Sequence, residues 1–227
     1  MNYSITTNIT PKCAAKLLLL GELDLSSDIP LDDACVILKE LMLLSTKDIL
    51  NIVDSSRYGN EADVKYIPQF GKIETISEVP KYFQKYGCRC ADYAQIGFYL
   101  KNDLNATLCA NTKFGENHGK VAALLGVVDC KNSRICPTFL TSAFCTFSDE
   151  DQQKILSKLF FRIPIIQILL RAAANGEVNG YSPMNQLKPS TKIRRAYSVK
   201  SILTFVRDVA ATELIFRLDN IYWKDEQ

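Results

Sequence analysis

The chain has 227 residues, of which 47% are hydrophobic and 23% charged, so it can bury a sizeable core and is not a disordered protein. A net charge of +2 excludes a strongly basic coat for nonspecific nucleic-acid binding. The charge is uneven: residues 1–65 hold six basic and ten acidic residues, residues 66–147 hold nine and six, and residues 181–227 hold eight and five.

The eight cysteines and the single histidine lack the spacing of metal ligands. Cys88 and Cys90 are separated by one residue, and no C-x-x-C pair occurs. We therefore expect no metal and no cofactor. No signal peptide is recognisable, and the longest apolar run, around residues 16–20, is too short to span a bilayer. These features predict a cytoplasmic protein with reduced thiols and no membrane partner.

Three helices are predicted in the N-terminal part, over residues 10–25, over residues 31–44, and from Ser45 or Thr46 through Val53. Thr10 is suited to cap the first helix. The polar stretch 56–69 follows and contains loop signals, so it predicts a domain boundary. We interpret residues 1–65 as an acidic helical module for support or interaction.

Two further helices are predicted over residues 77–86 and 91–100. The second carries an aromatic stripe formed by Tyr93, Phe98 and Tyr99. Such stripes belong to the core far more often than to base-stacking platforms, so we expect these rings to be buried.

Residues 104–141 are the most informative stretch. Asn105 is predicted to cap a helix that ends in a tight turn at Phe114-Gly115, and a second helix is predicted over residues 116–125. Gly126 suits the end of that helix. Strands are predicted from Val127 and over residues 135–140, around a polar tip at residues 130–134. Helix, turn, helix and β-hairpin is the order of a winged helix-turn-helix, whose second helix lies in the DNA major groove.

The polar side chains of this stretch suit DNA contacts. Asn117, His118 and Lys120 are predicted to share one exposed face of the second helix, while Lys131 and Arg134 at the wing point to the DNA backbone. Asparagine can pair bidentately with adenine, and lysine can contact guanine or phosphate. A helix–hairpin unit without any nucleic-acid role is the alternative.

The remaining chain predicts a second unit of the same order. Ser148 caps a helix from Asp149, a very apolar helix covers residues 165–174, and a basic helix covers residues 190–209. Two strands around Asp219-Asn220 complete a predicted hairpin over residues 214–223. The predicted phosphate contacts of this second winged helix are Lys192, Arg194, Arg195 and Lys200. A solvated charged face explains these four residues equally well.

At these motifs the chain resembles the winged-helix DNA-recognition regions of bacterial restriction endonucleases, over roughly residues 68–223. The resemblance rests on the helix end Leu-Leu-Gly-Val-Val at residues 124–128 and on Leu140-Thr141 after the wing. It also rests on Arg194, Arg195, Ser198 and Val199, with Ile202 where that family has tryptophan. In such enzymes this region reads the target site, and a separate nuclease domain, often of the PD-(D/E)xK type, cleaves it.

A nuclease centre within this chain has one candidate set, Asp54, Asp63 and Lys65. Two carboxylates and a lysine can hold Mg²⁺ and orient water. The span is short and lacks a convincing strand hairpin, and a solvated loop accounts for the same charges.

The sequence therefore predicts a mainly α fold with small β-hairpins, an α+β class of tandem winged helix-turn-helix units behind a helical N-terminal module. The predicted divisions are residues 1–65, 66–147 and 148–227. The predicted function is sequence-specific binding of double-stranded DNA as the recognition part of a restriction system, with a nuclease partner or a second copy supplying cleavage. The alternatives are a compact Mg²⁺-dependent endonuclease and a winged-helix protein-interaction module.

Overall fold

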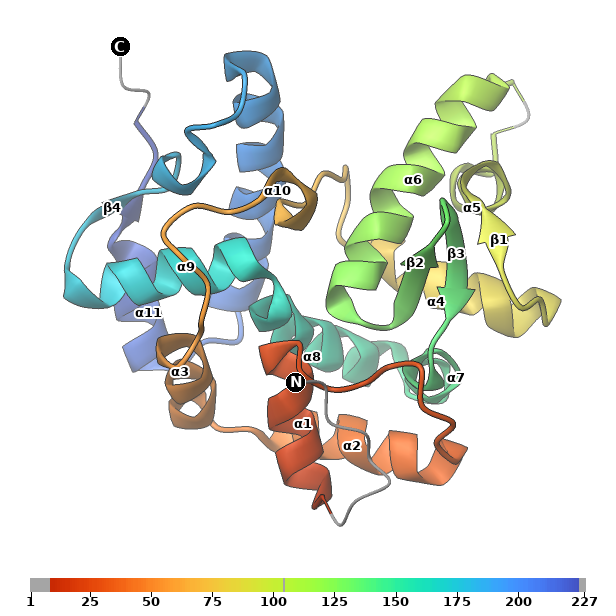
Figure 1. Ribbon diagram of the computed structural model, residues 1–227, viewed down its shortest axis with the longest axis horizontal. Coiled ribbons are helices and arrows are strands. Elements are labelled where there is room, and N and C mark those ends of the chain that lie inside the picture. The colour runs from red at the N-terminus through yellow and green to blue at the C-terminus, as the bar shows by residue number, and fades with distance from the viewer. Residues whose placement is uncertain (1–8, 104, 225–227) are drawn as a thin grey trace.

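The computed structural model describes residues 9–103 and 105–224, and this part of the chain is mainly helical with a few short strands, as predicted (Figure 1). The first helices are α1 (Pro11–Leu20), α2 (Leu31–Leu43) and α3 (Thr46–Asp54). Thr10 caps α1 by accepting a hydrogen bond from the backbone N–H of Cys13, and Ser45 caps α3. The Thr10 cap and the start of α3 at Thr46 confirm predictions made from local sequence.

A central unit follows the short 3₁₀ turn η1 (Val64–Tyr66). Its elements are α4 (Glu74–Tyr86), β1 (Ala91–Asp92), α5 (Tyr93–Lys101), α6 (Leu108–Leu125), β2 (Val128–Lys131) and β3 (Arg134–Pro137). The three strands form an antiparallel sheet in the order β1-β3-β2. Asn132 and Ser133 make the predicted hairpin turn with positive φ angles of 50° and 59°, the backbone that a two-residue hairpin loop requires.

Helix α6 corrects the predicted turn at Phe114-Gly115. It runs without interruption for 18 residues, and its N-cap is Thr107 rather than Asn105. Gly115 allows close contact between helices instead of breaking one, because a Cβ atom there would lie 1.9 Å from the carbonyl oxygen of Tyr93 on α5. The turn between consecutive helices therefore lies between α5 and α6.

The predicted strand over residues 135–140 is also too long. It ends at Pro137, and Thr138 caps the next helix, α7 (Phe139–Cys145). Gly126 ends α6 in the left-handed conformation, with a φ of 84°, as predicted.

A disulfide between Cys90 and Cys136 corrects the expectation that all thiols are reduced. Its origin is the strand register: Ala91 of β1 lies opposite Ile135 of β3, so the next antiparallel pair is Cys90 and Cys136. Their Cα atoms are 4.2 Å apart. The bond ties the start of β1 to the β2–β3 hairpin.

The C-terminal part contains α8 (Asp149–Leu159), η2 (Phe160–Arg162), α9 (Pro164–Ala172), η3 (Ala173–Asn175), β4 (Val178–Asn179), η4 (Ser182–Met184), α10 (Pro189–Arg207), α11 (Thr212–Asp219) and β5 (Ile221–Tyr222). The predicted hairpin over residues 214–223 is wrong. Residues 212–219 are helical, with Leu214 and Leu218 buried on one face, and β5 pairs in parallel with the distant β4. The second half of the described chain therefore lacks the predicted wing.

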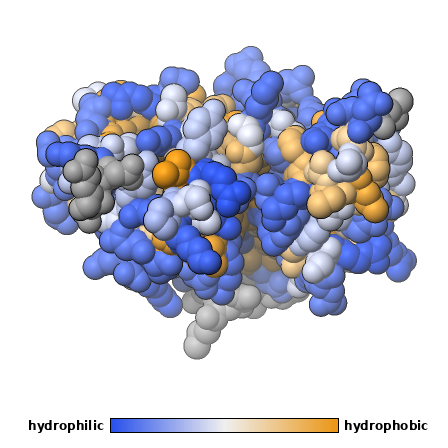
Figure 2. Space-filling model, turned by 90° about the horizontal axis from the view of Figure 1, so that it is seen from above, coloured by the Kyte–Doolittle hydropathy of each residue, from blue (hydrophilic) through white to orange (hydrophobic). Residues whose placement is uncertain are grey.

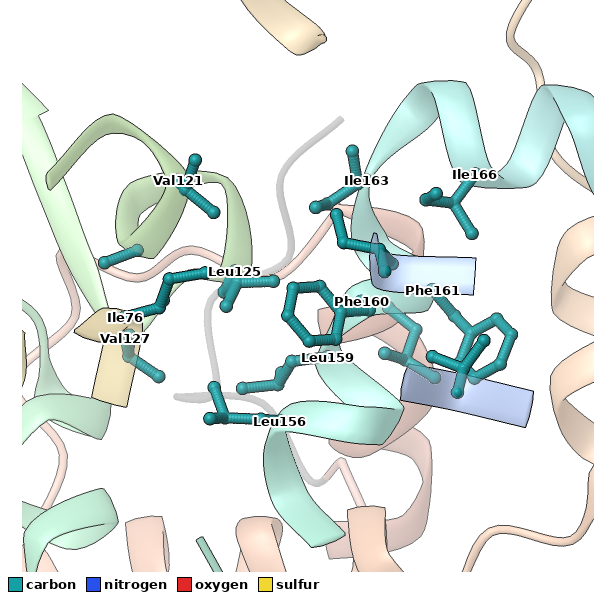
Figure 3. Packing of buried hydrophobic residues seen from close by; sticks show 14 of the residues in the cluster. Ile76, Val121, Leu125, Val127, Leu156, Leu159, Phe160, Phe161, Ile163 and Ile166 are labelled. Atoms are coloured by element: carbon teal, nitrogen blue, oxygen red, sulfur yellow. The ribbon is translucent and has the colours of Figure 1, made fainter. Parts of the chain in front are cut away.

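The buried side chains form one continuous cluster that runs from α1 to β5. Figure 3 shows Leu125 of α6 beside the Phe160 ring of η2, with Leu159 and Leu156 of α8 close below. The central and C-terminal segments therefore share a core, which fixes α6 relative to the elements that follow it.

Arg162 joins three segments from inside this core. Its Nε donates to the carbonyl oxygen of Leu18 at 3.1 Å, and its Nη1 donates to the carbonyl oxygens of Ala123 and Leu124. The guanidinium thus caps the C-terminal ends of α1 and α6, where the helix dipole is negative. Burial lowers the pKa of Arg162.

Within residues 9–103 and 105–224, no helix has both the length and the apolar character needed to cross a bilayer.

Candidate nucleic-acid interface

A cavity of about 260 Å³ lies between the outer face of α6 and the segment 64–69. Figure 1 shows α6 and α10 standing on either side of this segment. We call the cavity the α6 groove, and it is lined by Val64, Lys65, Ile67, Pro68, Gln69, Lys113, Glu116, Asn117, Lys120, Val121, Leu124 and Arg195. The groove joins predicted residues from three separate parts of the sequence.

The α6 groove is electropositive. Its lining includes the cations Lys65, Lys113, Lys120 and Arg195, against the carboxylate of Glu116. Lys113 and Lys120 both bind Glu116, with N–O distances of 2.8 and 2.6 Å. Hydrogen bonds from these lysines lower the pKa of Glu116. One carboxylate neutralises only one of the two lysines, so positive charge remains for an anionic partner.

Asn117 and Lys120 both line the α6 groove on the outer face of α6. The Lys120 side chain is 53% exposed, whereas Asn117, which was predicted to be exposed, is half-buried. His118 does not lie on this face, and its predicted role in DNA contact is wrong. Its residue surface is only 1% exposed, its Nδ1 lies 2.9 Å from the carbonyl oxygen of Phe114, and its ring packs on the Phe114 ring. Successive helical residues are about 100° apart, which turns His118 toward the core with Gly115 and Ala122. Burial lowers the pKa of His118.

The two wing residues are exposed on the hairpin. Lys131 pairs with Asp129 at 2.9 Å, and Arg134 donates through Nη2 to the carbonyl oxygen of Cys90 at 3.4 Å. The Lys131–Asp129 pair is partly exposed to solvent and such pairs contribute little stability, and the Arg134 hydrogen bond is long. Their side chains can therefore turn to a phosphate at small cost.

The four basic residues of α10 separate into different surroundings. Lys192 donates to Oδ1 of Asn185 at 2.8 Å, and its ammonium lies 5.4 Å from the centre of the Tyr181 ring. The ammonium of Lys200 lies 4.8 Å from the centre of the Trp223 ring. These two residues do not line the α6 groove.

Arg194 and Arg195 differ in burial and in their hydrogen-bond partners. Arg195 is half-buried, and its Nη1 donates to the carbonyl oxygens of Val64 and Ile67. Burial lowers its pKa. Arg194 is exposed and makes one bond within its own helix, from Nε to the carbonyl oxygen of Ser190 at 3.3 Å. Of this pair, Arg194 has the more accessible guanidinium.

The remaining residues of the arginine-containing motif are structural. The Ser198 hydroxyl accepts the backbone N–H of Phe70 at 3.0 Å and donates to the carbonyl oxygen of Phe70 at 3.1 Å. Val199 and Ile202 are fully buried. Together with Arg195, the motif fastens segment 64–70 to α10, so the predicted boundary at residue 65 falls in a bound segment.

Sequence reasoning missed Lys113 as a groove residue. The reason is the predicted turn at Phe114-Gly115, which assigned Lys113 to a different helix from Asn117. In a continuous helix Lys113, Asn117 and Lys120 occupy positions i, i+4 and i+7, which share one face. Prediction of residues 108–125 as one helix would therefore have placed Lys113 on the same face as Asn117 and Lys120.

The residues of the alternative nuclease centre are not brought together. Asp54 forms a two-bond salt bridge with Arg217, at 2.5 and 2.9 Å, and lines a different cavity from Lys65. Asp63 caps η1 and pairs with Lys65 at 3.2 Å. Among the residues that the structure describes, no three His, Cys, Asp or Glu side chains gather as a metal site.

Comparison with protein-family models, with curated proteins and with solved structures gives no match for this chain. The resemblance to restriction-enzyme recognition regions has no counterpart in these comparisons. A function for this chain is therefore inferred from the residues and the geometry of the α6 groove and its surroundings.

Proposed function

We propose that this protein binds double-stranded DNA and that α6 is the helix that enters the major groove. The element order α4, β1, α5, α6, β2, β3, with the sheet order β1-β3-β2, is compatible with a winged helix and supports this proposal. In this assignment α5 and α6 are the helix-turn-helix pair, whose second helix contacts base edges. The described part of the connection between them is residues 102–103 and 105–107, and in this assignment the β2–β3 hairpin is the wing.

The outer face of α6 is the observation that carries the proposal. Lys113, Asn117 and Lys120 follow one another along it, and neither lysine is buried. An asparagine amide can pair bidentately with adenine, and lysine can bind guanine or phosphate. Lys131 and Arg134 on the hairpin and Arg194 on α10 are suited to the DNA backbone.

Figure 2 shows the molecule from above, from the side on which α6 and α10 begin. Helices α6 and α10 both begin at the upper side of Figure 1, and the view from above shows a surface on which hydrophilic residues predominate. A polar, cation-bearing face is what a phosphate backbone requires.

The finer assignment is sequence-specific recognition within a restriction system, with cleavage supplied by a nuclease partner or a second copy. It rests on the sequence resemblance, above all on residues 124–128, which end α6 and begin β2. A Mg²⁺-dependent nuclease centre is less favoured, because Asp54 and Asp63 each have a cationic partner already. A protein-interaction module without DNA remains the competing class.

Selection of bound duplexes from a random pool, followed by measurement of affinity, tests the proposal. Asn117→Ala should cost about 1–3 kcal/mol at the preferred site and little on random duplex. The matched control is Asn51→Ala, which removes an exposed asparagine from α3. Wild-type protein that lacks salt-sensitive duplex binding would refute the proposal and favour a protein-interaction module.

Arg194 provides an independent check on the phosphate contacts. Arg194→Ala should weaken binding to all duplexes alike and reduce the slope of log affinity against log salt by about 1. Supercoiled plasmid should stay intact with the protein in Mg²⁺. Nicking that is lost in Asp63→Ala would instead assign the cleavage to this chain.

A further inference from the structure

A second cavity, of about 640 Å³, lies on α4 and α5 and shares no lining residue with the α6 groove. We call it the tyrosine cavity, and it is lined by Glu78, Tyr82, Lys85, Tyr86, Gln95, Phe98, Tyr99, Leu100 and Asn102. Its volume falls within the range of about 300–1,000 Å³ that small-molecule sites occupy. Four aromatic rings line this cavity, whereas the α6 groove has none.

The aromatic rings are grouped, and two of them are open to solvent. The ring of Tyr82 lies 4.8 Å from that of Tyr86 and 5.4 Å from that of Tyr99, measured between centroids. Tyr86 is 54% exposed and Phe98 is 45% exposed. The sequence predicts Phe98 as part of a buried stripe, so its exposure is a departure from that expectation. Exposed aromatic faces gathered at one hollow indicate a binding surface.

The tyrosine cavity also offers an unneutralised cation. The ammonium of Lys85 lies 5.3 Å from the centre of the Tyr86 ring and 5.5 Å from that of Tyr99. None of the described carboxylates lies within 4 Å of it, and the carboxylate of Glu78 is already paired with Lys81 at 2.9 Å. An anionic group is therefore the favoured partner of Lys85.

Two amides complete the polar lining. The side-chain oxygen of Gln95 accepts the backbone N–H of Asp92 at 2.9 Å, which leaves its NH₂ group to act as a donor. Asn102 is exposed at the end of α5 and can both donate and accept. Such groups suit the hydrogen-bonding edge of a nucleobase.

From this combination we propose that the tyrosine cavity binds a single unpaired nucleotide. The base stacks on the open faces of Tyr86 and Phe98, and its phosphate binds Lys85. Base stacking on aromatic side chains, with cations along the backbone, is how proteins hold single-stranded nucleic acid. A base within a duplex is shielded by its neighbours and has to leave the stack to reach such a cavity. This site is separate from α6 and does not depend on duplex binding.

Calorimetric titration of the full chain with adenosine monophosphate and with adenosine tests the site. Saturable binding of both is expected, tighter for the monophosphate. Phe98→Ala or Tyr86→Ala should weaken both ligands about 5- to 150-fold, the equivalent of about 1–3 kcal/mol for one stacked base. Lys85→Gln should weaken the monophosphate and leave adenosine unchanged.

Phe216→Ala is the matched control, because Phe216 is also exposed, at 61%, and lines a different cavity. It should leave both affinities unchanged. Phe98→Leu keeps an apolar side chain without an aromatic face, so it separates stacking from loss of fold, and circular dichroism verifies folding. Absence of saturable binding to the wild type, or equal losses in Phe98→Ala and Phe216→Ala, would overturn the proposal. Preferential binding of a proline-rich peptide over the monophosphate would overturn it as well.

Discussion

Arg194 and Arg195 are neighbours in the sequence, yet their guanidinium groups have different roles. Arg195 gives two hydrogen bonds to the carbonyl oxygens of segment 64–67, where its planar fork can reach both acceptors. Arg194 points to solvent. At the scale of single residues, charge alone therefore does not identify a phosphate contact. The exposed guanidinium of Arg194 can bind a phosphate without the loss of any hydrogen bond between α10 and segment 64–67.

The buried His118 predicts a pH dependence of stability. Its pKa is lower in the folded chain than in the unfolded chain. Below about pH 6.5 the imidazole is therefore protonated in the unfolded chain and still largely neutral in the folded chain. The stabilisation is complete above that pH and decreases as the pH falls, by at most about 1.4 kcal/mol per pH unit. His118→Phe retains the ring contact with Phe114 and removes the titration.

Urea denaturation of both proteins between pH 7.5 and 5.5 measures this effect. The chain has a single histidine, so no second imidazole titrates in this window. A wild-type stability that falls no more steeply than that of His118→Phe would contradict the assignment.

At the scale of elements, the crossing of α5 and α6 depends on two glycines. A Cβ atom at Gly97 would lie 1.8 Å from the carbonyl oxygen of Asn111, and one at Gly115 would lie 1.9 Å from that of Tyr93. These carbonyl oxygens belong to helix backbones, which cannot move aside for a methyl group as the end of a flexible side chain can. The two glycines therefore set how closely the helices approach and how α6 presents its outer face.

Gly115→Ala should accordingly destabilise the fold by about 1–3 kcal/mol or more, because the helices have to separate to admit the methyl group. Gly71→Ala is the control, since a Cβ atom there would meet nothing within 4 Å. Denaturant midpoints of the two variants give the comparison. Equal stability of Gly115→Ala and the wild type would show that α5 and α6 are not packed as described.

Local signals explain which elements the sequence could predict. Thr10, Ser45 and Ser148 each accept a hydrogen bond from their own helix, and that chemistry is contained within a few residues. Phe114-Gly115 carries a turn signal of the same local kind, but the contact of Gly115 with α5 overrides it. A close approach between helices cannot be seen from the glycine alone.

The same distinction holds for the candidate site. Asn117 and Lys120 were predicted because helical spacing places them on the polar face. His118 is one residue away and faces inward, because it shares the i, i+3, i+4 and i+7 spacing of Val121, Ala122 and Leu125 on the buried face. The pairing of β5 with β4, in contrast, is a contact between distant segments, whereas Asp219-Asn220 suggested a local hairpin.

At the scale of the whole molecule, one core serves all three predicted divisions. The continuous buried cluster contains residues from each of them, and Arg162 binds backbone carbonyls of both α1 and α6. The removal of any division would expose apolar surface of the others, and the removal of residues 1–65 or 66–147 would also take carbonyl partners away from the buried Arg162. The surface that we propose for DNA is therefore held by the entire fold.

Calorimetric unfolding should show a single cooperative transition. For a chain of 227 residues, an enthalpy of about 0.7 kcal/mol per residue near 60 °C gives about 160 kcal/mol in one step. The calorimetric and van't Hoff enthalpies should agree, and far-ultraviolet dichroism should change together with Trp223 fluorescence. Two resolved transitions would show that the divisions unfold independently.

The parallel pair β4–β5 has a consequence for how the chain matures on the ribosome. The backbone N–H groups of Val178 and Gly180 donate to the carbonyl oxygens of Asn220 and Tyr222, at 2.9 and 2.7 Å. At a translation rate of 5–20 residues per second, the roughly 40 residues between the strands take about 2–8 s to synthesise. Throughout that interval β5, the strand that pairs with β4, has not been synthesised, and neither has Trp223, whose indole covers Gly180. The nascent chain thus forms these two hydrogen bonds only after residues 220–222 have been made, later than the synthesis of α6.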